Sequence, residues 1–178
     1  SAQVVVLGKD AVPEDKAADP FCYRMALEGR RVIVLDQEQP LHYQAIPADI
    51  TPTNFAGRMG FSEDLSHPVF RGFQQADFFT WGNDHVLYRN AYRKGSKGGR
   101  SLLQCDDRLG YTALFESAVG DGLLLVSQLA IGDKINTTGV AQAVFNNMLN
   151  YAASYVPVRK NTLVAIPSSD PRARLLAD

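Results

Sequence analysis

The stretches QVVVLG (residues 3–8) and RRVIVLD (residues 30–36) decide the fold that this sequence predicts. Both are short runs of β-branched and other apolar residues, the pattern of a strand buried on both faces of a parallel sheet. The residues between them predict a helix that starts near Pro13 and ends near Gly29, with Pro20 dividing it into two pieces. Strand, helix and strand together predict a right-handed βαβ unit, and therefore an α/β protein.

The second half of the chain predicts further strands and one long helix. Residues 85–92 alternate as a strand does, and residues 111–131 form two apolar runs around a Gly-Asp-Gly turn, the signal of a hairpin. Apolar residues between Val140 and Tyr155 recur at spacings of three and four, behind an N-cap at Thr137 or Thr138. By contrast, prolines interrupt residues 37–66, where we expect surface loop with a helical turn or two in TNFAGRMGF.

These segments predict a three-layer α/β fold with a mostly parallel central sheet, helices on both faces and an added β-hairpin. The length of 178 residues and the hydrophobic content of 46% suit a single domain over residues 1–178. Residues 157–178 resemble the start of a further βα unit, so we expect the domain to be excised from a longer chain.

The charge balance gives no reason to expect nucleic acid as a partner. The chain has 18 Lys and Arg against 19 Asp and Glu, and no basic stripe that would neutralise several phosphates. No apolar run approaches the roughly 18 residues that span a membrane, so we expect no membrane contact. The sequence leaves the location open: the periplasm or exterior if the parent protein carries a signal peptide, and otherwise the cytoplasm.

The motifs of nucleotide binding and of nucleophilic catalysis are missing from the sequence, which contains no GxxxxGK[ST], GxGxxG, GxSxG or GxCxG string. Cys22 and Cys105 are interpreted as small buried hydrophobes, and a cysteine-dependent hydrolase or amidotransferase is kept as an alternative. His42, His67 and His85 stand alone, without metal-ligand spacing. We therefore predict no catalytic residue, no metal site and no cofactor.

The segment DFFTWGNDH (residues 77–85) contains the only tryptophan of the chain, beside two carboxylates and a histidine. Aromatic rings that face solvent beside polar groups can stack on sugars, but such rings also fill cores and interfaces. We interpret the tryptophan as a packing or interdomain anchor and keep a carbohydrate-binding module as an alternative. The candidate ligand-binding residues are Trp81, Asn83, Asp84, His85 and Tyr88.

Four strings in combination resemble a known family of domains. They are HPVFRGF (67–73), DFFTWGNDHVLYRNAY (77–92), LLQCDDRLGYTALFESAVGDGLLLVSQLAI (102–131) and VAQAVFNNMLNYAASY (140–155). This combination, over about residues 60–155, resembles the amidotransferase-like domain of large multidomain glycoside hydrolases of the β-galactosidase kind. The pairs Gln128-Leu129 and Asn150-Tyr151 lie at matching places.

The resemblance implies a class I glutamine amidotransferase-like, flavodoxin-like fold in which the nucleophilic cysteine and its partners are absent. It implies a non-catalytic accessory domain that supports domain packing, cleft shape or assembly of a glycoside hydrolase. The expected partners are the other domains of that enzyme, with a homo-oligomer and carbohydrate as further candidates. Fold alone does not define function, so this remains an expectation.

Overall fold

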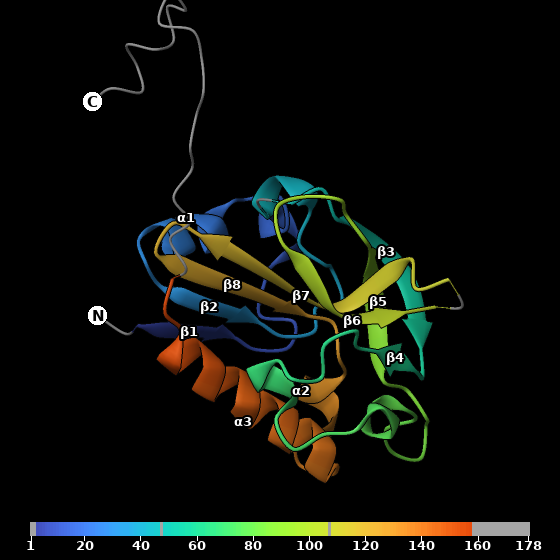
Figure 1. Ribbon diagram of the computed structural model, residues 1–178. Helices are drawn as coiled ribbons and strands as arrows, with labels where there is room; N and C mark the ends of the chain where they lie inside the picture. The colour runs from blue at the N-terminus through green and yellow to red at the C-terminus, as the bar shows by residue number, and fades with distance from the viewer. Residues whose placement is uncertain (1–2, 47, 107, 158–178) are drawn as a thin grey trace, which may run out of the picture.

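The computed structural model describes residues 3–46, 48–106 and 108–157, and the structural statements below concern these residues. The strand and helix expected within residues 158–178 lie outside them. One eight-stranded sheet runs through the molecule (Figure 1), with β1, β2, β8, β7, β5 and β3 as successive neighbours and β6 between β7 and β4. The strands are β1 Val4–Leu7, β2 Arg31–Val34, β3 Thr51–Gly57, β4 Gly60–Phe61, β5 Tyr88–Arg93, β6 Arg100–Cys105, β7 Tyr111–Val119 and β8 Gly122–Ser127.

The helical elements are short except for one. They are η1 Glu14–Lys16, α1 Phe21–Leu27, η2 Tyr43–Ala45, η3 Pro68–Phe70, η4 Gln75–Phe78, α2 Ile131–Lys134 and α3 Gly139–Ser154. The division of the first helical segment at Pro20 is confirmed, because η1 and α1 lie on either side of it. The long helix is also confirmed as α3, although its N-cap Thr138 makes no side-chain capping hydrogen bond.

The predicted βαβ unit forms the parallel end of the sheet. Strand β2 lies between β1 and β8 and is parallel to both. Alternate residues of β2 face opposite sides: Val32 belongs to the core cluster under α1, whereas Ile33 belongs to the cluster under α3. Figure 1 accordingly shows α1 and α3 on opposite sides of these strands. Gly122 permits the close approach of α1 to β8, because a Cβ there would collide with the carbonyl oxygen of Ala26.

The expectation of a three-layer, mostly parallel, flavodoxin-like sheet is wrong. The pairings of β2 with β1 and with β8 are parallel and the other strand pairings are antiparallel, so the sheet is mixed. Parallel neighbours need a crossover of a dozen or more residues, usually helical, whereas short loops join antiparallel neighbours. From β6 to β8 the described chain turns back twice through short loops without a helix. The Gly-Asp-Gly hairpin is confirmed, with Val119 opposite Gly122 and Gly120 at a φ of 55°.

The helical turn expected within residues 53–61 is also wrong, because the chain forms β3 and β4 there. Thr53, Phe55 and Gly57 face inward in alternation with exposed Asn54 and Ala56, the period of a half-buried strand. The Thr53 hydroxyl donates a hydrogen bond to the carbonyl of Ala91 on β5. The two-residue alternation of buried and exposed side chains, rather than helix propensity, therefore determines that this segment is a strand.

Strand β7 is the place where the parallel and antiparallel parts join. Strand β6 pairs with β7 over Tyr111 to Glu116, so β5 and β8 must share the other edge of β7. Gln128 follows β8 where these two strands meet, and its backbone N–H donates to the carbonyl of Ala113. The junction is thus occupied by one buried glutamine.

The Gln128 amide connects three segments at this junction. Its Oε1 accepts a hydrogen bond from the backbone N–H of Gln37 at 3.0 Å, and its Nε2 donates to the carbonyl of Gln37 at 3.1 Å. The same Nε2 lies 3.3 Å from the carbonyl of Arg89 and 3.1 Å from that of Asn90, both on β5. The side chain therefore provides hydrogen-bond partners for backbone groups after β2 and on β5 that the strand pairings do not use.

We expect Gln128→Ala to lower the free energy of unfolding by about 3 kcal/mol, because it leaves buried backbone groups without partners. Urea denaturation followed by circular dichroism measures the change. Gln142→Ala on the exposed face of α3 is the matched control, with an expected change below about 0.5 kcal/mol. Equal effects of the two substitutions would contradict this account of the junction.

Candidate functional site

The structure places the two aromatic candidates in the core. Trp81 is 2% exposed, and its indole Nε1 donates a hydrogen bond to the carbonyl of Asp77 at 2.8 Å. Tyr88 is also 2% exposed and stacks on Phe55, with ring centroids 6.3 Å apart. With so little exposed surface, neither ring forms an open stacking platform.

The polar candidates form an exposed turn that Lys134 holds in place. Asn83, Asp84 and His85 are exposed. The buried Lys134 ammonium donates to the carbonyls of Trp81 at 2.5 Å and Val86 at 2.6 Å, and to the Asp84 carboxylate. The hydrogen bond from Lys134 lowers the pKa of Asp84 below its ordinary value. Segment 77–85 is therefore a packed element with a tethered polar turn.

Both cysteines are packed inside the protein. Cys22 on α1 and Cys105 at the end of β6 have no exposed surface. Burial raises the pKa of each thiol to about 12, so neither forms a thiolate at neutral pH. The two cysteines belong to different core clusters, which gives them no common site.

We expect both thiols to react slowly with a disulfide reagent such as Ellman's reagent in the native protein. After unfolding in guanidinium chloride both should react at the rate of a small free thiol, since burial and the raised pKa are then lost. Absorbance at neutral pH follows the released product. Rapid modification of one cysteine in the native protein would contradict the assignment and favour a nucleophile.

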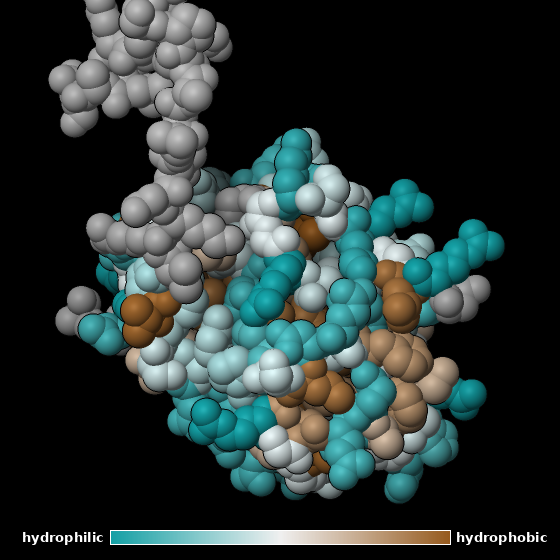
Figure 2. All heavy atoms as spheres, viewed as in Figure 1, coloured by the Kyte–Doolittle hydropathy of each residue, from teal (hydrophilic) through white to brown (hydrophobic). Residues whose placement is uncertain are grey.

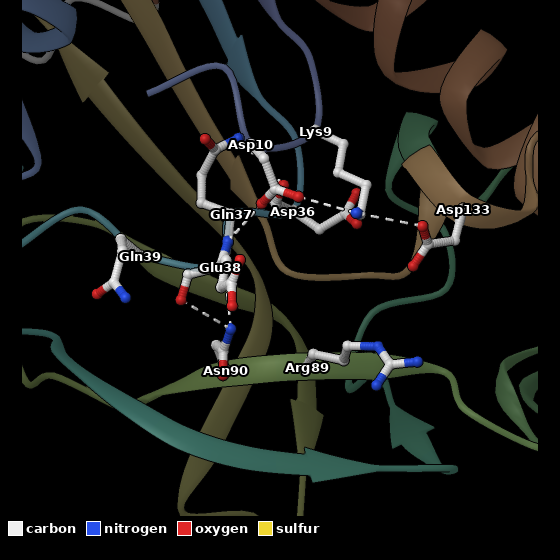
Figure 3. A pocket seen from close by; sticks show the side chains of 9 residues that line it. All are labelled: Lys9, Asp10, Asp36, Gln37, Glu38, Gln39, Arg89, Asn90 and Asp133. Atoms are coloured by element: carbon white, nitrogen blue, oxygen red, sulfur yellow. Dashed lines mark hydrogen bonds and ion pairs between the residues drawn. The ribbon is translucent and has the colours of Figure 1, made fainter. Parts of the chain in front are cut away.

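A polar hollow with a volume of about 490 Å³ lies beyond the carboxyl ends of β1 and β2 (Figure 3). Its residues come from the loops after these strands, from β5 and from α2. In α/β sheets, ligands bind at this edge of parallel strands. The lining residues are Lys9, Asp10, Asp36, Gln37, Glu38, Gln39, Arg89, Asn90 and Asp133.

Charged groups of both signs line this hollow. Lys9 Nζ lies 2.8 Å from Asp10 Oδ2 and 3.3 Å from Asp133 Oδ1, so two carboxylates already neutralise it. The Arg89 guanidinium is more weakly paired, at 3.9 Å from Asp84 Oδ2. Figure 3 shows Asp36 between Lys9 and Gln37, with Arg89 on the opposite side. The hollow is therefore a mixed-charge site.

Asp36 is the most buried carboxylate of the hollow, with 6% of the residue exposed. Its Oδ1 accepts a hydrogen bond from the backbone N–H of Gly132 at 3.0 Å, which fixes its orientation. Burial raises the pKa of Asp36, and the hydrogen bond from Gly132 only partly offsets this. A buried carboxylate with a raised pKa in a hollow is a feature of functional sites.

Internal hydrogen bonds make the wall of the hollow rigid. Gln37 Oε1 accepts from the N–H of Val12 at 2.9 Å, while its Nε2 donates to the carbonyl of Gly8 at 2.8 Å. Asn90 Nδ2 donates to the carbonyls of Gln37 and Glu38, each at 3.1 Å. The backbone of Asn90 has a φ of 51°, a left-handed conformation that Asn tolerates better than most residues. These bonds hold the loops after β1 and β2 against β5.

A second polar cluster lies between η3, β7 and α3. His67 Nε2 is 3.3 Å from Glu116 Oε2, and the Tyr151 hydroxyl donates to the same oxygen at 2.6 Å. Arg100 Nε donates to Glu116 Oε1 at 3.0 Å. Burial alone would raise the pKa of Glu116, but the interactions with His67 and Tyr151 outweigh it and hold this pKa below the ordinary 4.5. Glu116 therefore connects these elements as a carboxylate.

A lowered pKa in the folded state makes the Glu116 contribution to stability depend on pH. The contribution is complete above the ordinary pKa of 4.5 and is lost as the pH falls through the lower folded value. We expect Glu116→Gln to be less stable than wild type near neutral pH, with a difference that shrinks below about pH 4.5. Urea unfolding over a pH series measures it, with exposed Glu63→Gln as control. A difference independent of pH would contradict the assignment.

A second hollow, with a volume of about 450 Å³, is mostly apolar and lies beside β4. Met59, Phe61, Tyr88 and Leu109 line it, together with Arg58 and Asp106. Figure 2 shows apolar side chains interspersed with polar ones over this end of the molecule. Since its lining offers few groups for polar recognition, the hollow beyond β1 and β2 is the better candidate site.

Among the described residues, no three His, Cys, Asp or Glu side chains gather in a way that could hold a metal ion. Within the same residues, none of the helices is long and apolar enough to cross a membrane.

Comparisons with known proteins bear on the fold alone. No protein-family model matches the sequence, and no curated protein is significantly similar to it. A solved structure with a similar fold is "Cytoplasmic Protein STM3548 from Salmonella typhimurium". The two share 11% sequence identity with a TM-score of 0.55, over 84% of this chain and 71% of that chain. Such distant similarity shows a common arrangement of elements and does not indicate a shared activity.

Sequence patterns identified some of the residues in and near the polar hollow. Asp84 is one of the predicted candidates, and it lies 3.9 Å from Arg89, which lines the polar hollow. Asp36 and Gln37 were missed as site residues, although their position directly after a parallel strand is the signal that would have identified them. Lys134 was missed because it lies 53 residues from Trp81 in the sequence.

Proposed function

We propose that this chain is a non-catalytic accessory domain of a glycoside hydrolase of the β-galactosidase kind, where it supports domain packing, cleft shape or assembly. The observation that carries the proposal is the placement of four residues from the strings of the family resemblance: His67, Trp81, Gln128 and Tyr151. Each makes contacts inside the chain, and the first three are buried. Residues of these strings thus act as structural anchors.

The described part of the chain supports a non-catalytic role in a second way. Nucleophilic catalysis needs an activated nucleophile with a base within hydrogen-bond reach. Both thiols are buried and protonated at neutral pH. Among the described residues, the His67 ring contacts the Glu116 carboxylate and the Tyr151 ring, and neither of these contacts is with a thiol. The alternative of a cysteine-dependent hydrolase or amidotransferase is accordingly not proposed.

Reading the coding sequence on both sides of residues 1–178, followed by assay of the full chain, tests the proposal. We expect a neighbouring domain with two carboxylates about 5 to 10 Å apart across a sugar cleft. Turnover of nitrophenyl glycosides should require those carboxylates, and the present domain alone should show none. The control is the double variant Cys22→Ser with Cys105→Ser, which should leave kcat of the full chain unchanged.

Two results would contradict this function. One is a full chain without any glycoside hydrolase domain. The other is turnover by the isolated domain that disappears in the double cysteine variant while its thermal midpoint stays high enough for folding at the assay temperature.

A further inference from the structure

We propose that the polar hollow beyond β1 and β2 is a binding site for a small, neutral, polyhydroxylated ligand of the saccharide class. This goes beyond the accessory role and does not depend on it. It also differs from a stacking platform on Trp81, because that ring is buried. The hollow has a volume of about 490 Å³, within the range of about 300 to 1,000 Å³ that is usual for small-molecule sites.

The polar groups of the hollow favour hydroxyl groups over charged ligands. Each hydroxyl can donate one hydrogen bond and accept others, so a sugar needs carboxylates as well as cationic or amide donors around it. The hollow offers carboxylates from Asp36 and Glu38 beside the guanidinium of Arg89 and the amide of Gln39 (Figure 3). Acceptors and donors therefore line the same hollow, as hydrogen bonding to neighbouring ring hydroxyls requires.

The charges disfavour both anions and simple cations. Four carboxylates and only two cationic side chains line the hollow, so a phosphate or a carboxylate ligand would meet an excess of negative charge. Lys9 already lies between two of these carboxylates and occupies the place that a small cation would take. A neutral ligand avoids both penalties.

Asp36 is the recognition group that the structure singles out. It is nearly buried, its Oδ1 is fixed by Gly132, and it lines the hollow beside Lys9 and Gln37. At neutral pH an ionised carboxylate in this place opposes folding, because burial raises its pKa. A carboxylate that is buried at the edge of a hollow, although burial disfavours its charge, is a candidate for ligand recognition.

Nuclear magnetic resonance of the ¹⁵N-labelled protein tests the site, with methyl β-D-galactopyranoside as the neutral probe. We expect saturable shifts of the side-chain amides of Gln39 and Asn90, with affinity in the millimolar range because no aromatic ring lines the hollow. Galacturonate is the anionic probe and glycine the zwitterionic probe, and both should bind more weakly. No shift at the hollow up to about 100 mM neutral sugar would overturn the proposal.

Asp36→Asn gives a readout that a purely structural residue would not produce. The amide oxygen can keep the hydrogen bond from Gly132, while the charged acceptor is lost. We expect sugar affinity to fall at least about tenfold while the thermal midpoint at neutral pH rises. Glu38→Gln should also weaken binding, and exposed Glu63→Gln, which does not line the hollow, should leave it unchanged.

The outcomes separate this site from the accessory role. Unchanged affinity in Asp36→Asn, or tighter binding of galacturonate or glycine than of the neutral sugar, would overturn the saccharide site and leave the accessory role standing. Conversely, a full chain without a glycoside hydrolase domain would remove the accessory role but not the binding result.

Discussion

The rest of the structure depends on the hydrogen bonds between the Gln128 side chain and the backbone of Gln37. A sheet that is parallel at one end and antiparallel at the other must change partners somewhere, and the strands that separate there leave backbone groups unpaired. Here β5 and β8 share one edge of β7, and Gln128 lies where they meet. One amide group replaces the regular ladder and connects the end of β2 with β5.

The same junction creates the polar hollow. Gln128 and Asn90 hold the loop after β2 against β5, and Asp36, Glu38 and Arg89 line the hollow that remains beside this contact. The wall is fixed by hydrogen bonds of Gln37 and Asn90, so the lining groups keep their relative positions. A rigid frame with side chains of both charges is a suitable arrangement for recognising a neutral polar molecule. The Gln128 side chain and the polar hollow are therefore adjacent, but Gln128 does not line the hollow.

Local patterns predicted the parts of the fold that depend on local physics. The β-branched runs gave β1 and β2, the Gly120 turn gave the β7–β8 hairpin, and the spacing of apolar residues gave α3. The direction of most strands was predicted wrongly because a flavodoxin-like fold was assumed from resemblance, although the short loops from β6 to β7 and from β7 to β8 permit only antiparallel neighbours. Strand β3 was missed because Pro52 and Gly57 obscured its alternation. The candidate site was missed because its residues come from four separate segments.

Native-state hydrogen exchange of the Gln37 backbone amide tests the central claim most directly. Gln37 lies beyond the end of β2, where a loop amide would ordinarily exchange quickly, but its N–H donates to the buried Oε1 of Gln128. If this bond holds the junction, the Gln37 amide should exchange only through global unfolding, at a free energy equal to that of core amides such as Val32. Exchange of Gln37 as fast as that of an exposed loop amide, with Val32 still protected, would contradict the account.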